Sequence, residues 1–100
     1  MSASPPPTND AGAPWRDLTI KNKHGMHARP AALFIKTASQ FKSDIAIEKE
    51  GTKVSGRSIM GLLTLELYHG SAVRVHADGP DAKEALDALE ALINRKFDEE

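Results

Sequence analysis

The chain has 100 residues, of which 40% are hydrophobic, so it is long enough for one small domain with its own core. Thirteen basic residues against 14 acidic ones give a net charge of −1, and this balance argues against a nucleic-acid-binding protein, which needs a basic surface. The sequence has no cysteine, which excludes disulfides and thiolate metal sites. It also has no apolar stretch long enough to span a membrane. We therefore expect a cytoplasmic protein that is not inserted into a membrane.

Residues 1–14 differ in composition from the rest of the chain. They contain four of the six prolines, and their only hydrophobic residues are Met1 and three alanines. Such a segment cannot bury enough apolar surface to fold. We predict a disordered N-terminal extension over residues 1–14 and a folded domain over residues 15–100.

The first half of the domain has the pattern of a strand, a helix and a hairpin. Alternation of apolar and polar residues predicts a strand around residues 18–20. Helical spacing of apolar residues then predicts an amphipathic helix of about three turns. The apolar positions of this helix are Ala31, Phe34, Ile35, Ala38 and Phe41. Residues 44–48 and 52–55 predict two further strands, joined by a turn at Glu50-Gly51.

The next predicted elements are a short helix and a fourth strand. Ser58 is suited to the N-cap of a helix that runs from Ile59 to about Leu67. The strand that follows covers residues 73–76. Its His76 is expected to be half exposed.

A third helix closes the domain. Asp81, with Glu84 three residues later, resembles a capping box that begins this helix. Its apolar stripe is Ala85, Leu86, Leu89, Leu92 and Ile93. The order β-α-β-β-α-β-α predicts an α+β domain with its helices packed on one face of a small antiparallel sheet.

The run from Gly25 to Ala32 places a histidine where a loop becomes a helix. The first amides of a helix lack intrahelical acceptors and the helix dipole is positive there, so an anion carried on His27 would be stabilised. Arg29 adds a guanidinium that can pair with phosphate oxygens, and Pro30 fits the first turn. We interpret this run as a phosphohistidine site. Pairing of His24 with His27 around a metal is a poor alternative because no acid or thiol lies close by, and we predict no metal and no cofactor.

Two motifs carry a resemblance to a known family. They are Gly25-Met26-His27-Ala28-Arg29-Pro30-Ala31 and, further along, Arg57-Ser58-Ile59-Met60-Gly61-Leu62-Leu63. With the order of strands and helices around them, they resemble the HPr family, the histidine-containing phosphocarrier proteins of the bacterial phosphotransferase system. The resemblance covers roughly Leu18 to Lys96. It implies an open-faced β-sandwich with a four-stranded sheet in the order 1-4-2-3 and three helices on one face.

The resemblance also implies a role for each motif residue. His27 would take a phosphoryl group from enzyme I on its Nδ1 atom and pass it to an enzyme IIA domain, and Arg29 would neutralise the phosphoryl oxygens. Such a protein is a phosphoryl carrier in the relay, not an enzyme. We expect a monomer.

The second motif implies regulation and docking. Ser58 matches the serine that a dedicated kinase, HPr kinase/phosphorylase, phosphorylates in many members to switch off the relay. Ile59, Met60 and Leu63 match the apolar patch that both partner proteins contact. The simpler interpretations are that Ser58 is only an N-cap and that a member of the apolar set belongs to the core.

Two other classes of function compete with the carrier interpretation. One is a regulatory protein of the same fold that docks on other proteins without carrying phosphate, against which the presence of both His27 and Arg29 argues. The other is a small nucleic-acid-binding module, which needs exposed aromatic pairs on strands and a basic face. The acidic end of the chain is similar to the nitrogen-related branch of the family, whereas the Ser58 motif is similar to kinase-regulated members. The sequence is compatible both with a pathway for sugar uptake and with a regulatory pathway.

Overall fold

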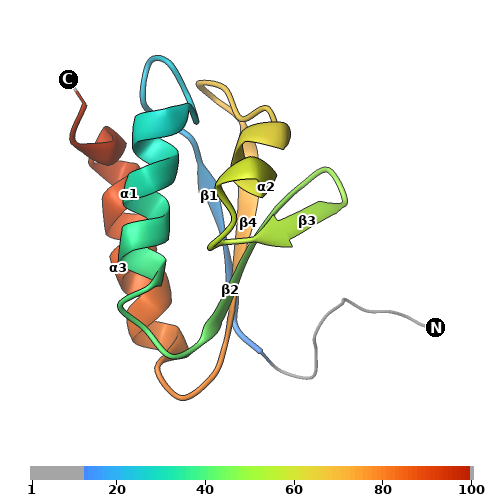
Figure 1. The fold of residues 1–100 in the computed structure, drawn as a ribbon, viewed down its shortest axis with the longest axis vertical. Helices are drawn as coiled ribbons and strands as arrows, with labels where there is room; N and C mark the ends of the chain where they lie inside the picture. The colour runs from blue at the N-terminus through green and yellow to red at the C-terminus, as the bar shows by residue number, and fades with distance from the viewer. Residues whose placement is uncertain (1–12, 100) are drawn as a thin grey trace.

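The computed structural model describes residues 13–99 (Figure 1). Its elements are, in chain order, β1 (Trp15–Thr19), α1 (Ala28–Ala38), β2 (Asp44–Lys49), β3 (Thr52–Ser55), α2 (Ile59–Thr64), β4 (Ala72–Asp78), α3 (Ala82–Asn94) and the short turn η2 (Lys96–Asp98). This order confirms the predicted β-α-β-β-α-β-α arrangement. The predicted disordered extension lies, except for its last two residues, outside the described residues.

The strands form one antiparallel sheet in the order β1-β4-β2-β3, which confirms the predicted order 1-4-2-3. Val75 lies opposite Arg16 of β1 on one side and opposite Ile47 of β2 on the other, so β4 is a central strand. The three helices cover one face of the sheet (Figure 1). None of the helices within residues 13–99 is long and apolar enough to cross a lipid bilayer.

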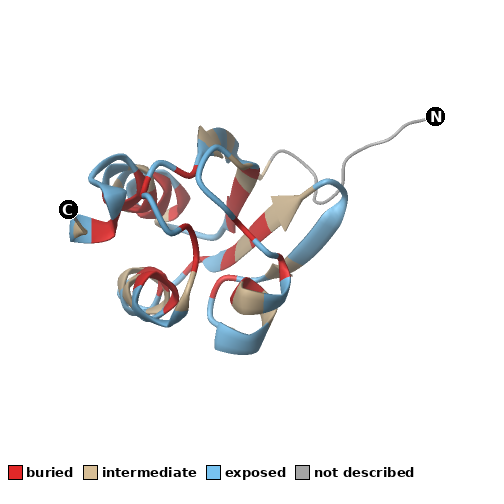
Figure 2. Cartoon of the chain, turned by 90° about the horizontal axis from the view of Figure 1, so that it is seen from above, coloured by how far each residue is buried: buried red, intermediate tan, exposed pale blue. Residues whose placement is uncertain are grey.

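The core lies between the sheet and the helices. Side chains of a strand alternate between its two faces, and this places Ile47 and Val75, both fully buried, beneath the helices. Helix α1 contributes Phe34, and α3 contributes Leu89, also fully buried. Figure 2 shows the buried segments of the helices and strands turned toward the interior of the domain.

Helix α2 is shorter than predicted and ends at Thr64 rather than near Leu67. Leu65 and Leu67, which follow the helix, are both buried. Glu66 between them has a left-handed backbone with φ of 57°. Lys49 Nζ donates to the carbonyl of Glu66 at 2.7 Å, which secures this end of the helix.

Asp81 precedes α3 as predicted, but the prediction that its side chain forms a capping box is wrong. The Asp81 side chain makes no hydrogen bond to its own helix. It accepts instead from the Lys42 amide at 2.9 Å and from the Ser43 amide at 3.0 Å. Hydrogen bonds from Ser43 and Lys42 lower the pKa of the Asp81 carboxyl below its ordinary value. This residue therefore joins the loop after α1 to the start of α3.

His76 was expected to be half exposed, and this prediction is wrong. The residue is only 8% exposed, and its Nε2 atom lies 2.8 Å from Oε1 of Glu48 on the neighbouring strand. Strict alternation in a sequence identifies which face of a strand a residue occupies. It does not show whether neighbouring side chains cover that residue.

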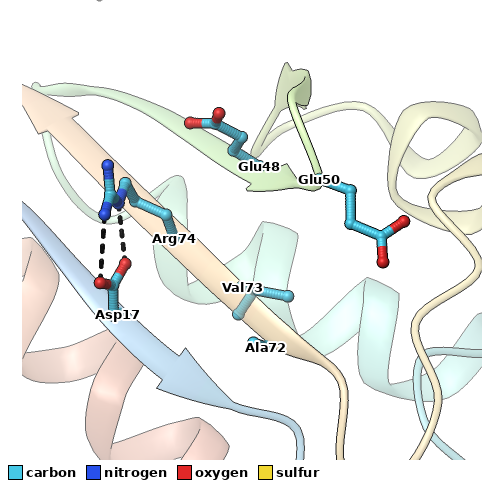
Figure 3. A pocket seen from close by; sticks show the side chains of 6 residues that line it. All are labelled: Asp17, Glu48, Glu50, Ala72, Val73 and Arg74. Carbon is cyan, nitrogen blue, oxygen red and sulfur yellow. Dashed lines mark hydrogen bonds and ion pairs between the residues drawn. The ribbon is translucent and has the colours of Figure 1, made fainter. Parts of the chain in front are cut away.

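The outer face of the sheet carries a hollow of about 300 Å³ in which Arg74 is already paired with Asp17 (Figure 3). It is lined by Asp17, Glu48, Glu50, Ala72, Val73 and Arg74. The Arg74 guanidinium donates from Nε to Asp17 at 2.7 Å and stacks on the Trp15 ring at 3.8 Å from its centroid. The hydrogen bond from Arg74 lowers the pKa of Asp17 below its ordinary value. The one cation in this lining is therefore engaged.

Candidate functional site

The loop before α1 is fixed against the segment that follows α2. Gly25 has φ of +67°, and a Cβ atom at this position would lie 2.3 Å from the carbonyl oxygen of Leu67. Only glycine fits this combination of left-handed backbone and close approach. The Met26 amide then donates to the same Leu67 carbonyl at 2.9 Å. These contacts determine where the chain enters α1.

His27 is the N-cap residue of α1, with φ of −126° and ψ of −166°. Its carbonyl accepts from the Ala31 amide at 3.0 Å, whereas its side chain makes no capping hydrogen bond. By their position in the first turn, the amides of Ala28 and Arg29 have no intrahelical acceptor. Pro30, which has no amide hydrogen, is buried at the third helical position. The imidazole is therefore held at a helix start with two donors available beside it.

The two nitrogens of the His27 ring have different surroundings. The side chain is 44% exposed, and Nε2 lies 3.0 Å from Oε2 of Glu99. Nε2 is shielded from solvent, and it lies close to the carboxylate without the geometry of a hydrogen bond. Nδ1 is not among the shielded atoms and has no hydrogen-bond partner within residues 13–99. Nδ1 is therefore the less shielded of the two ring nitrogens.

Glu99 and Asn22 belong to the site, and sequence reasoning missed both. Glu99 Oε1 accepts from Asn22 Nδ2 at 3.0 Å, and Asn22 is fully buried. The same Nδ2 donates to the carbonyl of Gly25 at 2.7 Å. Glu99 thereby connects the His27 ring to the loop that precedes it.

An unusual turn brings Glu99 to this position. Lys96, Phe97 and Asp98 have φ values of 60°, 54° and 59°, a left-handed conformation that non-glycine residues disfavour. Phe97 is fully buried and anchors the turn, and Arg95 Nε donates to Asp98 at 2.9 Å. We call residues 95–99 the C-terminal turn. Its burial and pairing hold Glu99 against the site.

Arg29 is exposed and makes no ion pair within residues 13–99. The pKa of Asp98 lies below its ordinary value, first because Arg95 donates a hydrogen bond and then because the charges of Arg95 and Arg29 attract the carboxylate. Arg29 is thus close enough to the C-terminal turn to act on its charge. Its guanidinium remains available to an incoming anion.

Ser58 is the N-cap of α2, as predicted. Its Oγ accepts from the Gly61 amide at 3.0 Å. The preceding residue, Arg57, donates from Nη2 to the carbonyls of Ala38 at 2.9 Å and Phe41 at 2.8 Å. The start of α2 is thereby connected to the end of α1.

The predicted docking residues divide into two groups. Ile59 is 42% exposed and Met60 is 67% exposed, which is unusual for large apolar side chains. Leu63 is half-buried and packs against the core, which supports in part the simpler interpretation that one of these residues belongs to the core. We call Ile59, Met60 and Leu63 the apolar patch. Helix α2, which carries the patch, contacts α1.

The rings of His24 and His27 lie edge to face, with centroids 6.3 Å apart. Within residues 13–99, no group of three His, Cys, Asp or Glu side chains is arranged to hold a metal ion.

Comparison with known proteins gives consistent results. The family described as PTS HPr component phosphorylation site matches residues 15–95. The chain is 45% identical over 84 residues to the phosphocarrier protein HPr of Cupriavidus necator, a match that covers 84% of this chain and 94% of that protein. It is 44% identical over 81 residues to the HPr-like protein Crh of Halalkalibacterium halodurans, covering 81% of this chain and 96% of that protein.

Solved structures give the same result. The HPr-C-His structure from Thermoanaerobacter tengcongensis matches with a TM-score of 0.84 and 49% identity, over 87% of this chain and 98% of that chain. Another structure from the same organism, with a TM-score of 0.70 and 51% identity over 82% of this chain and 94% of that chain, is described as an HPr dimer. The monomer expected for the present chain stays a prediction. The family matches residues 15–95, and these relatives share 45% and 49% sequence identity with the chain over more than four fifths of its length. The chain therefore belongs to the HPr family.

Proposed function

We propose that this protein is a phosphocarrier of a phosphotransferase relay, with His27 as the phosphoryl acceptor. The observation that carries the proposal is the position of His27 at the start of α1, with Nδ1 as the less shielded ring nitrogen and the exposed Arg29 two residues later. A helix start stabilises an anion through its free amides and its dipole. Neutral imidazole is nucleophilic, so this ring suits the role of acceptor.

The transfer step needs little from the carrier itself. The Nδ1 lone pair of His27 attacks phosphorus on phosphorylated enzyme I, and the bond from phosphorus to the donor nitrogen breaks with its electron pair left on the donor. A second, equivalent step passes the group to a histidine of an enzyme IIA domain. Because the transferring group is loosely bonded in the transition state, positioning and charge neutralisation provide most of the stabilisation. Arg29 and the first-turn amides supply both.

A carrier must also release its phosphoryl group. Glu99 places a negative charge 3.0 Å from the His27 ring. This charge repels the anionic phosphoryl group and opposes the pull of Arg29 and the helix start. The balance keeps the adduct reactive toward the next acceptor.

Ser58 is the proposed site of regulatory phosphorylation by an HPr kinase/phosphorylase. A phosphate on Ser58 Oγ would lie at the start of α2, beside the exposed Ile59 and Met60 side chains. It would add a negative charge of roughly 1.5–2 units at neutral pH to a surface that partners must desolvate. The apolar patch would then bind enzyme I and enzyme IIA weakly.

A second candidate is a regulatory protein of the same fold that carries no phosphate. The observation that favours it is the 44% identity to relatives named HPr-like protein Crh. The two candidates differ in one property, which is whether His27 becomes phosphorylated. They share the apolar patch and Ser58.

The test is incubation of the full chain with enzyme I and phosphoenolpyruvate, followed by intact mass spectrometry before and after brief acid treatment. The carrier proposal predicts a single phosphoryl addition that acid removes, and no addition to a His27→Ala variant. Onward transfer to enzyme IIA is read in the same reaction after IIA is added. An unmodified wild-type chain, with enzyme I shown to be active on a control carrier, contradicts the proposal and supports the regulatory candidate.

A further inference from the structure

We propose that a second anion site, separate from His27, binds a diphosphate group in a hollow of about 250 Å³ at the end of the domain. The hollow is lined by Lys21, Lys23, His69 and Lys96. We call it the basic hollow. Neither the phosphoryl-acceptor proposal nor the apolar patch uses any of these four side chains.

Two of the lysines are directed by the loop after β1. Asn22 is fully buried, and its side chain is held by the Gly25 carbonyl and by Glu99. Because Asn22 is turned inward, its neighbours Lys21 and Lys23 are exposed on the outside of the loop. The same hydrogen bonds that build the His27 site therefore hold the loop backbone that carries both lysines.

The other two groups come from segments that are held equally firmly. The Gly70 amide donates to the Ile20 carbonyl at 2.8 Å, and the Ile20 amide donates to the Ser71 carbonyl at 2.9 Å. These bonds place His69 beside the loop that carries the lysines. Lys96 precedes the fully buried Phe97, which anchors the C-terminal turn. Three separate parts of the chain are thus arranged around one hollow before any ligand arrives.

The charges around the hollow are unbalanced. No carboxylate contributes to its lining, and none of its three lysines makes an ion pair in the part of the chain that the structure describes. Arg16, in contrast, is paired with Asp87 at 2.6 Å. Three ammonium groups around one hollow repel each other unless an anion lies between them. The arrangement is therefore suited to a multivalent anion.

The chemistry of the lining favours phosphate over carboxylate. Ammonium groups are compact point charges without the planar fork by which arginine binds carboxylates. They contact tetrahedral phosphate from several directions, as phosphate-binding lysines do. The three lysines, supplied by two segments, can contact two linked phosphate groups at once. We infer that the ligand is a diphosphate, either inorganic or part of a nucleoside diphosphate.

The test is an NMR titration of the unphosphorylated full chain with pyrophosphate at low ionic strength. The proposal predicts saturable shifts in the amides of residues 20–24, 68–71 and 95–98, and a dissociation constant that rises with salt. In a Lys21→Gln/Lys23→Gln variant, binding should weaken roughly tenfold. The matched control is Lys36→Gln/Lys53→Gln, which removes two exposed lysines outside the hollow and should leave the dissociation constant within about twofold.

Further arms identify the source of the ligand and separate the two sites. ADP that binds as tightly as pyrophosphate indicates a nucleotide ligand, and preference for pyrophosphate indicates an inorganic one. A His27→Ala variant should bind pyrophosphate as the wild type does, so this result does not depend on the phosphoryl-acceptor proposal. Four results would overturn the inference: no saturable binding, equal binding of citrate, equal weakening in the control variant, or loss of binding in His27→Ala.

Discussion

Replacing Arg29 with alanine should separate function from stability. The side chain is exposed and has no ion pair within residues 13–99, so its removal should change the free energy of unfolding by less than about 0.5 kcal/mol. In phosphoryl transfer, the same guanidinium is proposed to bind the phosphoryl oxygens. A hydrogen bond to a charged group contributes about 1.5–3 kcal/mol. Loss of that energy from the transition state slows transfer roughly 10-fold to 100-fold.

The assay compares rates of phosphoryl transfer from enzyme I with thermal unfolding of the same samples. Lys36→Ala is the matched control, since it removes one positive charge from the other end of α1. The control should transfer at close to the wild-type rate. The reasoning is refuted if Arg29→Ala loses stability in proportion to its rate, or if the control slows as much as Arg29→Ala does.

Three other substitutions test separate parts of the site. Ser58→Asp keeps an N-cap acceptor, so it should unfold like the wild type yet accept phosphoryl groups roughly tenfold more slowly, and an unchanged rate would remove the regulatory role of Ser58. Glu99→Gln keeps an acceptor for Asn22 but removes the charge beside His27. The equilibrium constant for phosphoryl exchange with enzyme I, measured by quantitative mass spectrometry, should therefore shift about fivefold toward the phosphorylated carrier. A shift in the other direction would contradict the proposed repulsion. Arg57→Ala removes the guanidinium donor shared by the carbonyls of Ala38, Phe41 and Ser43, so calorimetry should show a loss of about 1–2 kcal/mol in unfolding free energy, and an unchanged melting temperature would show that this contact contributes nothing.

Features that depend on neighbours in sequence could be predicted. Helical spacing identified α1 and α3, alternation identified the strands, and the position of His27 and Ser58 before helices followed from local signals. The structure places His27 and Ser58 as these signals indicated, each as the N-cap of its helix.

Features that depend on contacts between distant segments could not be predicted. Asn22 and Glu99 are separated by 77 positions, and no periodicity connects them. The C-terminal turn has a left-handed conformation without glycine, so the residues that form it carry no turn signal. Asp81 had the spacing of a capping box, but Ser43 and Lys42 offered its carboxylate better donors. The acidic end could have been noticed as a source of charge near a cationic site, but only burial of Phe97 determines where that charge lies.

The central claim is that His27 reacts through Nδ1 at the start of α1. Phosphorylation of protein labelled with nitrogen-15 in its histidines, followed by NMR detection of phosphorus–nitrogen coupling, identifies the bonded atom directly. Our account predicts coupling to Nδ1 of His27 in the wild type. Coupling to Nε2, which Glu99 shields, or to another histidine would contradict it.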